Sequence, residues 1–381
     1  MRSFNILACL TALASVLSIG AARAQEPLSL ARNGSFYVGG HMTEIDGRAM
    51  MVGHMYVEYM IPAKQTRPYP IIFVHGGLRT GVNFTSTLDG QEGWAQFFVR
   101  QGYPVYIVDQ VGRGRSPIIE QAYGPSKMGD VRGVLKRYSQ EENYKLWPQA
   151  HLHTPWPGGG GMDDPWVVQL SLSQAVEIDN FHTQQELNRD ALVALVDKIG
   201  PSIILGHSQA GAFLWPVADA RPDKIKAILG IEPNGPPVRA VDFIGAPDWF
   251  QYGKVSLAYG IADVPLIYAP PVKDASELKF VQQDKPDGEG LVRCFEQVAP
   301  ARQLPNLRDI PILVLTSEAS YHAPYDHCTV SYLRQAGAKP DFIKLADLGI
   351  KGDSHVLMLE KNSAAIAGVI AKWLAQAIPG K

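Results

Sequence analysis

The segment Pro-Ser-Ile-Ile-Leu-Gly-His-Ser-Gln-Ala-Gly, residues 201–211, constrains the fold of this chain more than any other. Its apolar start predicts a buried strand, and the residues after the serine suit a helix. A tight turn between strand and helix that exposes a serine hydroxyl beside backbone N–H groups is a nucleophile elbow, commonly G-x-S-x-G. Here Gly206 and Ser208 match, and Ala210 supplies a small side chain in place of the last glycine. We therefore interpret Ser208 as a catalytic nucleophile.

Segments with strand and helix patterns alternate around this elbow. Strands are expected at residues 35–38, 50–60, 70–74, 103–109, 225–232, 310–316 and 341–345, and helices at 93–101, 190–199, 329–336 and 363–377. The first two strands are expected to form an antiparallel pair closed by Asp46-Gly47. The alternation predicts an α/β fold with a mostly parallel, doubly wound sheet, helices on both faces, and a ligand crevice at the carboxyl ends of the strands.

Two segments depart from the alternation. Residues 116–179 and 236–305 are rich in Pro, Gly, Trp and Tyr and contain only short periodic pieces. Long connections of this kind in a compact domain are commonly lids or binding loops. We expect one domain over residues 25–381, with both segments inserted as caps above the crevice.

The first 24 residues have the pattern of a signal peptide. Arg2 supplies a positive start, a mostly apolar run follows, and Ala22-Arg23-Ala24 is an A-x-A cleavage site. We expect the mature chain to be exported and to be periplasmic or secreted. No later apolar run reaches the length of a membrane span, so stable membrane insertion is not expected.

The overall composition indicates a small or neutral partner. The formal net charge is -2 and charged residues make up 19% of the chain, which gives no basic excess for nucleic acid. Of the three cysteines, Cys9 lies in the leader. Cys294 and Cys328 remain in an oxidising compartment, either as one disulfide or as two buried thiols.

A serine nucleophile needs a base, and His355 lies where that base belongs. It follows the last expected strand and precedes the final helix, in Gly-Asp-Ser-His-Val-Leu-Met, residues 352–358. The triad of this architecture runs in the chain order serine, acid, histidine. His355 is therefore assigned the role of general base.

The other histidines are expected to have structural roles and not catalytic ones. His207 adjoins the nucleophile, but neighbouring strand residues point to opposite faces, so we expect it to pack into the sheet. His322 and His327 lie near Asp326 without a complete set of metal ligands, and no metal site is expected there. His153 is expected on the surface of the first cap insertion.

The residues leave the orienting acid open between two positions. Glu232 ends the strand directly after the elbow helix, and Glu318 follows the next strand, which is the more usual place for the acid. Asp326 is a weaker alternative on the same connection. Glu232 is favoured, and the carboxylate that is not the acid is expected to cap a helix or pair with a cation.

Two backbone N–H groups are the natural donors to an oxyanion. One belongs to Gln209, directly after the nucleophile, and the other to Gly77, in the glycine turn after an early strand. The Gly-Arg-Gly-Arg-Ser motif at residues 112–116 lacks the lysine and spacing of a phosphate loop. Its glycines are expected to shape a turn.

These motifs together resemble the α/β-hydrolase superfamily, and within it the branch of secreted bacterial serine esterases typified by esterase 713. Further matches are Thr-Leu-Asp-Gly-Gln-Glu-Gly-Trp at residues 87–94, the segment 108–116, Glu-Pro at 232–233 and Gly-Asp-Ser-His at 352–355. The resemblance implies a Ser208–His355–Glu232 triad. It departs at Gly77 and Leu78, where the type member of the branch has two adjacent cysteines.

The sequence as a whole predicts an exported serine hydrolase that cleaves carboxylic esters through an acyl-enzyme, with no cofactor or metal. Its expected partner is a small-molecule ester. Cap aromatics suggest that this substrate is partly apolar: Trp156, Trp166, Trp249, Phe250 and Tyr252. Two alternatives stay open: the same triad acting on another bond, as in an amidase, a carbon–carbon hydrolase or a lyase, and a binding protein on a hydrolase fold. The oligomeric state also stays open.

Overall fold

The computed structural model of the protein describes residues 26–379, and the expected signal peptide lies outside these residues. Within them, eight strands form one sheet in the order β1-β2-β4-β3-β7-β8-β13-β14. The strands are β1 (Leu30–Ile45), β2 (Arg48–Pro62), β3 (Ile71–Val74), β4 (Val105–Asp109), β7 (Ser202–His207), β8 (Ile225–Ile231), β13 (Ile312–Thr316) and β14 (Pro340–Lys344). From β4 to β14 all neighbours pair in parallel. The predicted mostly parallel sheet is confirmed.

Helices cover both faces of the sheet because its central strands are apolar on both sides. In β3, Ile71 and Phe73 belong to one buried cluster while Ile72 and Val74 belong to the other, as the alternation of side chains along a strand requires. One face is covered by α1 (Trp94–Arg100) and α9 (Ser363–Ala377). The other is covered by α6 (Phe181–Ile199), α7 (Gly211–Ala220) and α8 (Asp326–Gln335).

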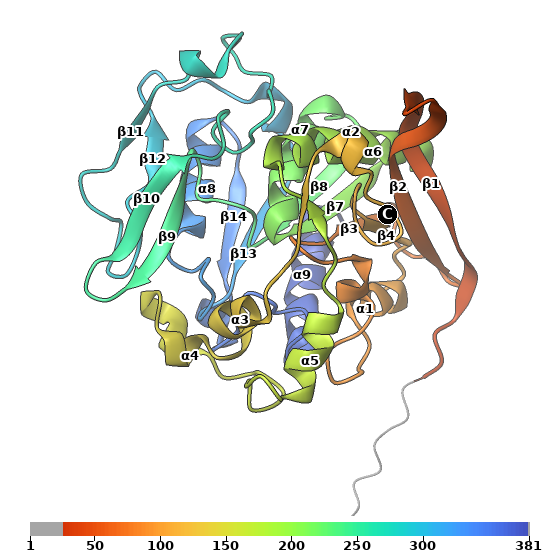
Figure 1. The fold of residues 1–381 in the computed structure, drawn as a ribbon, viewed down its shortest axis with the longest axis horizontal. Coiled ribbons are helices and arrows are strands. Elements are labelled where there is room, and N and C mark those ends of the chain that lie inside the picture. Colours follow the sequence, from red (N-terminus) through yellow and green to blue (C-terminus); the bar gives the residue numbers. More distant parts are fainter. Residues whose placement is uncertain (1–25, 380–381) are drawn as a thin grey trace, which may run out of the picture.

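The first two strands form an antiparallel hairpin that is longer than predicted. The expected turn at Asp46-Gly47 is present, with φ of 51° and 71°, the left-handed conformation that a two-residue hairpin turn needs. β2 continues the sheet by pairing antiparallel with β4, and β1 is the edge strand. Gly39 and Gly40, in the middle of β1, also have positive φ values of 65° and 77°. Figure 1 shows this hairpin at the right-hand edge of the molecule.

The two segments expected as insertions contain short elements outside the main sheet. The first includes α2 (Glu120–Tyr123), β5 (Ser126–Lys127), α3 (Val131–Val134), a π-helical turn at Leu135–Ser139, α4 (Glu141–Tyr144), a 3-10 turn at Pro148–Leu152, α5 (Pro165–Leu172) and β6 (Glu177–Ile178). The second forms two small sheets, from β9 (Arg239–Gly245) with β10 (Trp249–Val255) and from β11 (Phe280–Gln282) with β12 (Phe295–Gln297). In Figure 1 the second segment lies beside α8, on the side of the molecule opposite the β1–β2 hairpin.

Among residues 26–379, every helix is too short or too polar to cross a membrane.

Candidate active site

The strand-to-helix turn at the end of β7 holds Ser208 in a strained conformation. Its φ of 55° lies in the left-handed region, which non-glycine residues seldom adopt outside functional turns. The neighbouring glycines provide the space that the turn needs. A Cβ on Gly206 would lie 2.9 Å from Leu214 of α7, and one on Gly211 would overlap Pro233. Gly211 therefore allows the start of the helix to approach Pro233 closely, and the small side chain of Ala210 beside it is also completely buried.

Glu232 follows β8 and is completely buried. Its Oε2 lies 2.6 Å from His355 Nδ1 and accepts a hydrogen bond from Ser320 Oγ at 2.7 Å. Its Oε1 accepts from the backbone N–H of Ser317 at 2.8 Å and from the hydroxyl of the same residue. Both carboxylate oxygens are thus fixed by donors from the segment after β13, and the carboxylate is aimed at the imidazole.

His355 lies in the loop between β14 and α9, with 1% of its surface exposed. The ring is packed among the rings of His207, Tyr321 and His322, with centroid distances of 4.4, 4.5 and 4.5 Å. Within residues 26–379 its Nε2 has no hydrogen-bond partner. Burial holds the pKa of His355 well below its usual value, and the nearby positive groups act in the same direction. A neutral imidazole with a free Nε2 can accept a proton.

Tyr321 lies close to both Ser208 and His355. The Tyr321 ring packs against His355, and the side chain of Ser208 is close enough to the Tyr321 hydroxyl to influence its pKa, which burial raises well above the usual value. His207 supports the same arrangement from β7, because its Nε2 lies 2.9 Å from the backbone oxygen of His355. His207 is buried, as expected, but it packs against the histidine loop as well as the sheet.

The alternative acids have other partners. Glu318 accepts a hydrogen bond from the backbone N–H of Gly352 at 2.9 Å, in the loop that carries His355, and this contact is neither the helix cap nor the cation pair that we expected. Asp326 lies 3.0 Å from Nδ1 of His322. Burial raises the pKa of Asp326 and lowers that of His322 to about 4, so both groups favour their uncharged forms.

A buried network joins the two loops that carry Gly77 and Gln209. Glu177 of β6 pairs with Arg113 at 2.5 Å and accepts from the backbone N–H of Leu78 at 2.8 Å. Arg113 donates to the backbone oxygen of Gly76 at 3.2 Å and to the side-chain oxygen of Gln209 at 2.7 Å. The two N–H groups proposed for the oxyanion therefore belong to loops that share one ion pair.

The sequence interpretation missed this network. It treated residues 112–116 as a turn, which Gly112 and Gly114 do form with φ of 79° and 47°, and it gave Arg113 no role. One sequence feature could have indicated that Arg113 is buried: it lies between two turn glycines, Gly112 and Gly114, and apolar residues flank this turn. Its side chain is 1% exposed, and a buried guanidinium needs partners that only the fold reveals.

A cavity of about 310 Å³ opens beside Ser208. Its aromatic lining differs from the prediction, because it comes from other residues: Trp147, Phe243, Tyr321 and Tyr325. Trp156, one of the cap aromatics taken to indicate a partly apolar substrate, is buried in the core on the α1 and α9 face of the sheet. The remaining walls carry polar groups, including Arg137, Asn234, Asp242 and His322. The cavity is therefore mixed in character, lined by both aromatic and polar side chains.

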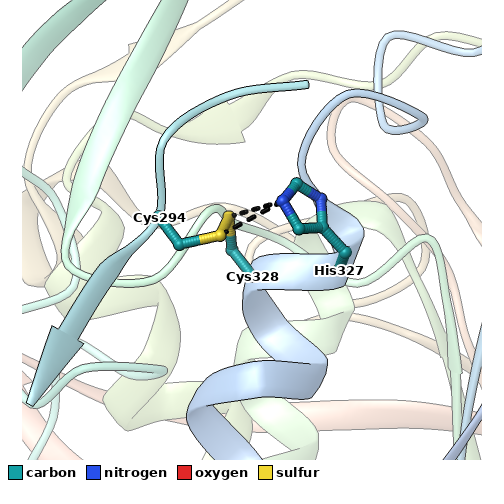
Figure 2. A group of neighbouring side chains, drawn as sticks. All are labelled: Cys294, His327 and Cys328. Atoms are coloured by element: carbon teal, nitrogen blue, oxygen red, sulfur yellow. Dashed lines mark hydrogen bonds between the residues drawn. A yellow bond between two sulfur atoms is a disulfide. The ribbon is translucent and has the colours of Figure 1, made fainter. Parts of the chain in front are cut away.

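Cys294 and Cys328 form a disulfide that ties the second insertion to α8, as Figure 2 shows. The ring of His327 lies beside it, with Nε2 3.2 and 3.6 Å from the two sulfurs. Two sulfurs bonded to each other are not thiolate ligands for a metal. Glu232, His322 and His355 also bring donor atoms within 4.8 Å of one another, but both carboxylate oxygens of Glu232 are already held by hydrogen bonds.

One expectation about the first insertion is wrong. His153 is 8% exposed and is not a surface residue, because its Nε2 lies 2.8 Å from a carboxylate oxygen of Glu360. Glu360 also accepts from the backbone N–H of Ser354, the residue before His355, at 3.0 Å. Asp353 lies in the same buried region, and burial raises its pKa to about 8. The insertion is thus packed into the loop that carries His355.

Known proteins resemble this chain along most of its length. Residues 69–252 match the model of the alpha/beta hydrolase fold family. A probable secreted lipase, phiG, of a fungal species is 39% identical over 342 residues, covering 89% of this chain and 88% of the relative. Lipase LipV of Mycobacterium tuberculosis is 30% identical over 172 residues, covering 41% of this chain and 58% of the relative.

A solved structure described as a novel bacterial esterase has the same fold. It superposes with a TM-score of 0.64 at 22% identity, covering 93% of this chain and 98% of that chain. Together with the sheet order and the elbow, these similarities define a hydrolase of the α/β class. The chain belongs to the α/β-hydrolase family, among its esterases and lipases.

Proposed function

We propose that this enzyme cleaves carboxylic esters through a covalent acyl-enzyme on Ser208. The Ser208 oxygen attacks the ester carbonyl carbon while Nε2 of His355 takes the hydroxyl proton. The same proton then passes from His355 to the oxygen of the leaving alcohol. A water molecule, deprotonated by His355, then attacks the acyl carbon. The bond between that carbon and the Ser208 oxygen breaks, His355 returns the proton to Ser208, and the carboxylic acid is released.

In this proposal Glu232 orients His355 and stabilises its positive charge during each proton transfer. The Nδ1 proton of His355 has a fixed acceptor 2.6 Å away, which favours the tautomer whose Nε2 is free. The backbone N–H groups of Gly77 and Gln209 are the proposed donors to the oxyanion, and each such donor contributes roughly 3 kcal/mol to transition-state stabilisation.

The observation that carries the proposal is the hydrogen-bond pattern of His355. One ring nitrogen faces a buried carboxylate and the other has no partner within the described residues, in a loop that packs against the tyrosine next to Ser208. In the described part of the chain, the neighbouring His207 also has one ring nitrogen without a partner, Nδ1, but its other nitrogen faces a backbone oxygen, whereas that of His355 faces the buried carboxylate of Glu232.

We further propose that the mature enzyme is exported. Three observations support this: the leader pattern of residues 1–24, the disulfide between Cys294 and Cys328, and the similarity to a relative named as a probable secreted lipase. Disulfides persist mainly in oxidising compartments. The mass of the protein recovered from the periplasm or medium tests this, because cleavage after Ala24 leaves Gln25 as the first residue.

The activity is tested with p-nitrophenyl esters of different acyl lengths and with a fluorophosphonate probe, using the mature protein and Ser208→Ala. We expect turnover and a single probe adduct in the wild-type protein, with both lost in the variant. Turnover that persists in Ser208→Ala would contradict the assigned nucleophile. Failure of the wild-type protein both to hydrolyse and to take up the probe would contradict the enzyme proposal as a whole.

A further inference from the structure

Two arginines next to the candidate site have no carboxylate partner. Arg79, on the turn after β3, is 4% exposed. Arg137, on the π-helical turn Leu135–Ser139 of the first insertion, is exposed within the cleft. Among residues 26–379, no carboxylate oxygen lies within the 4.0 Å ion-pair distance of either guanidinium.

This arrangement contrasts with the other arginines of the same region. Arg113 pairs with Glu177 at 2.5 Å, and Arg115 pairs with Asp109 at 2.8 Å. Within residues 26–379, the acceptors of Arg79 are uncharged groups: Leu170 O at 2.7 Å, Ser173 Oγ at 3.3 Å and the Tyr138 hydroxyl. Burying a charge without a counter-ion destabilises a fold. Arg79 is such a buried cation, and Arg137 is an exposed one that lines the cavities beside it, so both are candidates for binding an anion that comes from outside the chain.

Both arginines face space that adjoins the candidate catalytic residues. Arg137 lines the cavity of about 310 Å³ that contains Ser208. It also lines a second cavity of about 220 Å³, together with Arg79 and Gly77. The guanidinium of Arg137 lies 5.5 Å from the centre of the Tyr321 ring, and that of Arg79 lies 5.8 Å from the centre of the Tyr138 ring. Arg137 thus lines both the cavity that contains Ser208 and the cavity that contains Gly77.

We propose that the site prefers esters that carry a second, free carboxylate, and that Arg137, assisted by Arg79, binds this carboxylate. The proposal rests on the ester hydrolysis proposed above and adds the class of substrate. A guanidinium presents paired N–H donors whose geometry matches a carboxylate. A monoester of a dicarboxylic acid, or an acylated hydroxy acid, has both the bond for Ser208 and the anion for Arg137.

Acidic residues also line the two cavities, and the charge of Asp242 contributes to raising the pKa of Arg137. Asp242 lines the first cavity and Asp130 the second, but neither is an ion-pair partner of the arginines. The electrostatic influence of both arginines reaches the candidate base, because Arg137 and Arg79 add to the effect of burial in lowering the pKa of His355. A bound carboxylate would offset that influence and make the imidazolium form of His355 more accessible during proton transfer.

The test compares charged and neutral esters of the same length. For the acyl side, the pair is monomethyl adipate and dimethyl adipate, and for the alcohol side it is 6-acetoxyhexanoate and 6-acetoxyhexanamide. Hydrolysis is followed by product chromatography at low ionic strength, where the attraction between exposed charges is least screened. We expect the anion of at least one pair to have roughly tenfold higher kcat/KM per ester bond, the size of one charge-assisted hydrogen bond.

Two variants locate the effect. Arg137→Gln should reduce the ratio of kcat/KM for the charged and neutral members of the preferred pair by roughly tenfold. Lys136→Gln removes the same charge from the neighbouring residue, whose ammonium lies 5.9 Å from the Tyr144 ring and which lines neither cavity, and should leave the ratio unchanged. Inhibition of neutral-ester hydrolysis by adipate, compared with adipamide, should weaken in Arg137→Gln alone.

The outcomes separate this proposal from the proposed ester hydrolysis. Turnover of the neutral esters without preference for either anion would overturn the carboxylate site and leave the esterase intact. An equal decrease of the charged-to-neutral kcat/KM ratio in Arg137→Gln and Lys136→Gln would also overturn it, because the preference would then come from the net positive charge of the surface and not from a specific site. Absence of hydrolysis and of probe labelling in the wild-type protein would overturn both proposals.

Discussion

Replacing Glu232 by glutamine tests the assignment of the triad acid more sharply than deleting it. The volume is unchanged, and the structure dictates how the amide must sit. Oε1 accepts from the backbone N–H of Ser317, which is a fixed donor, so the amide oxygen has to take that position. The NH₂ group then faces Nδ1 of His355, where Oε2 now lies 2.6 Å away.

The consequence is the wrong tautomer of His355. An NH₂ group donates to Nδ1, so the ring proton moves to Nε2, and in the proposed mechanism Nε2 can then no longer accept the proton of Ser208. The corresponding acid-to-amide change in a Ser-His-Asp triad lowers kcat by about 10⁴, or about 5.5 kcal/mol at 1.36 kcal/mol per tenfold. We expect a loss of 10³ to 10⁴ in kcat for Glu232→Gln, with KM changed little.

The matched control is Glu318→Gln, which changes the alternative acid in the same way. Glu318 contacts the backbone of Gly352, so we expect its variant to keep kcat within about fivefold. Steady-state hydrolysis of a p-nitrophenyl ester gives both values, and thermal unfolding checks that both variants fold. A loss of 10³ in Glu318→Gln with near-normal turnover in Glu232→Gln would refute the assignment.

Three further changes test other parts of the structure. Asp353→Asn should become more stable relative to wild type as pH rises from about 4 to 8. The pKa of the buried carboxyl is about 8 in the fold and near 3.9 when unfolded, so over this range the wild-type carboxyl ionises in the unfolded state and stays protonated in the fold, which favours unfolding. Tm measured at pH 5, 7 and 9 checks this, and a constant difference in Tm between the two proteins would contradict it. Cys294→Ser should lose roughly 3 to 4 kcal/mol, because the disulfide to Cys328 closes a separation of 34 residues; reductant should lower the Tm of the wild type and not of the variant. Glu177→Gln should lower kcat by roughly tenfold through misplacement of the Leu78 turn, and an unchanged kcat with lowered Tm would show that its role is only structural.

Local sequence patterns were sufficient to predict the sheet and the elbow. The turn at Asp46-Gly47, the helix at Ser363–Ala377 and the strand before Ser208 each depend on neighbouring residues, and each is found where it was expected. The acid could not be decided from the residues alone. β8 and β13 are parallel neighbours, so Glu232 and Glu318 leave the sheet at the same edge, and only side-chain packing decides which one faces Nδ1 of His355.

Contacts between distant segments set the limit of the sequence interpretation. Arg113 lies in the turn after β4 and Glu177 lies near the end of the first insertion, with Gln209 beyond both, and no periodicity links them. The same holds for His153, which finds Glu360 at a separation of 207 residues. In a segment without periodicity, the sequence does not indicate which residue a polar side chain contacts. A buried ion pair therefore cannot be distinguished from a solvent-exposed one by its sequence.

The glycine pair in β1 has a consequence for the behaviour of the protein in concentrated solution. A long edge strand with free N–H and C=O groups is a template on which other chains can add, and regular backbone makes it a better one. Gly39 and Gly40 turn the backbone of β1 into left-handed conformations halfway along its 16 residues. The pairing of β1 with β2 keeps one register across these glycines, but the edge is no longer regular extended backbone, which makes intermolecular sheet growth harder to start.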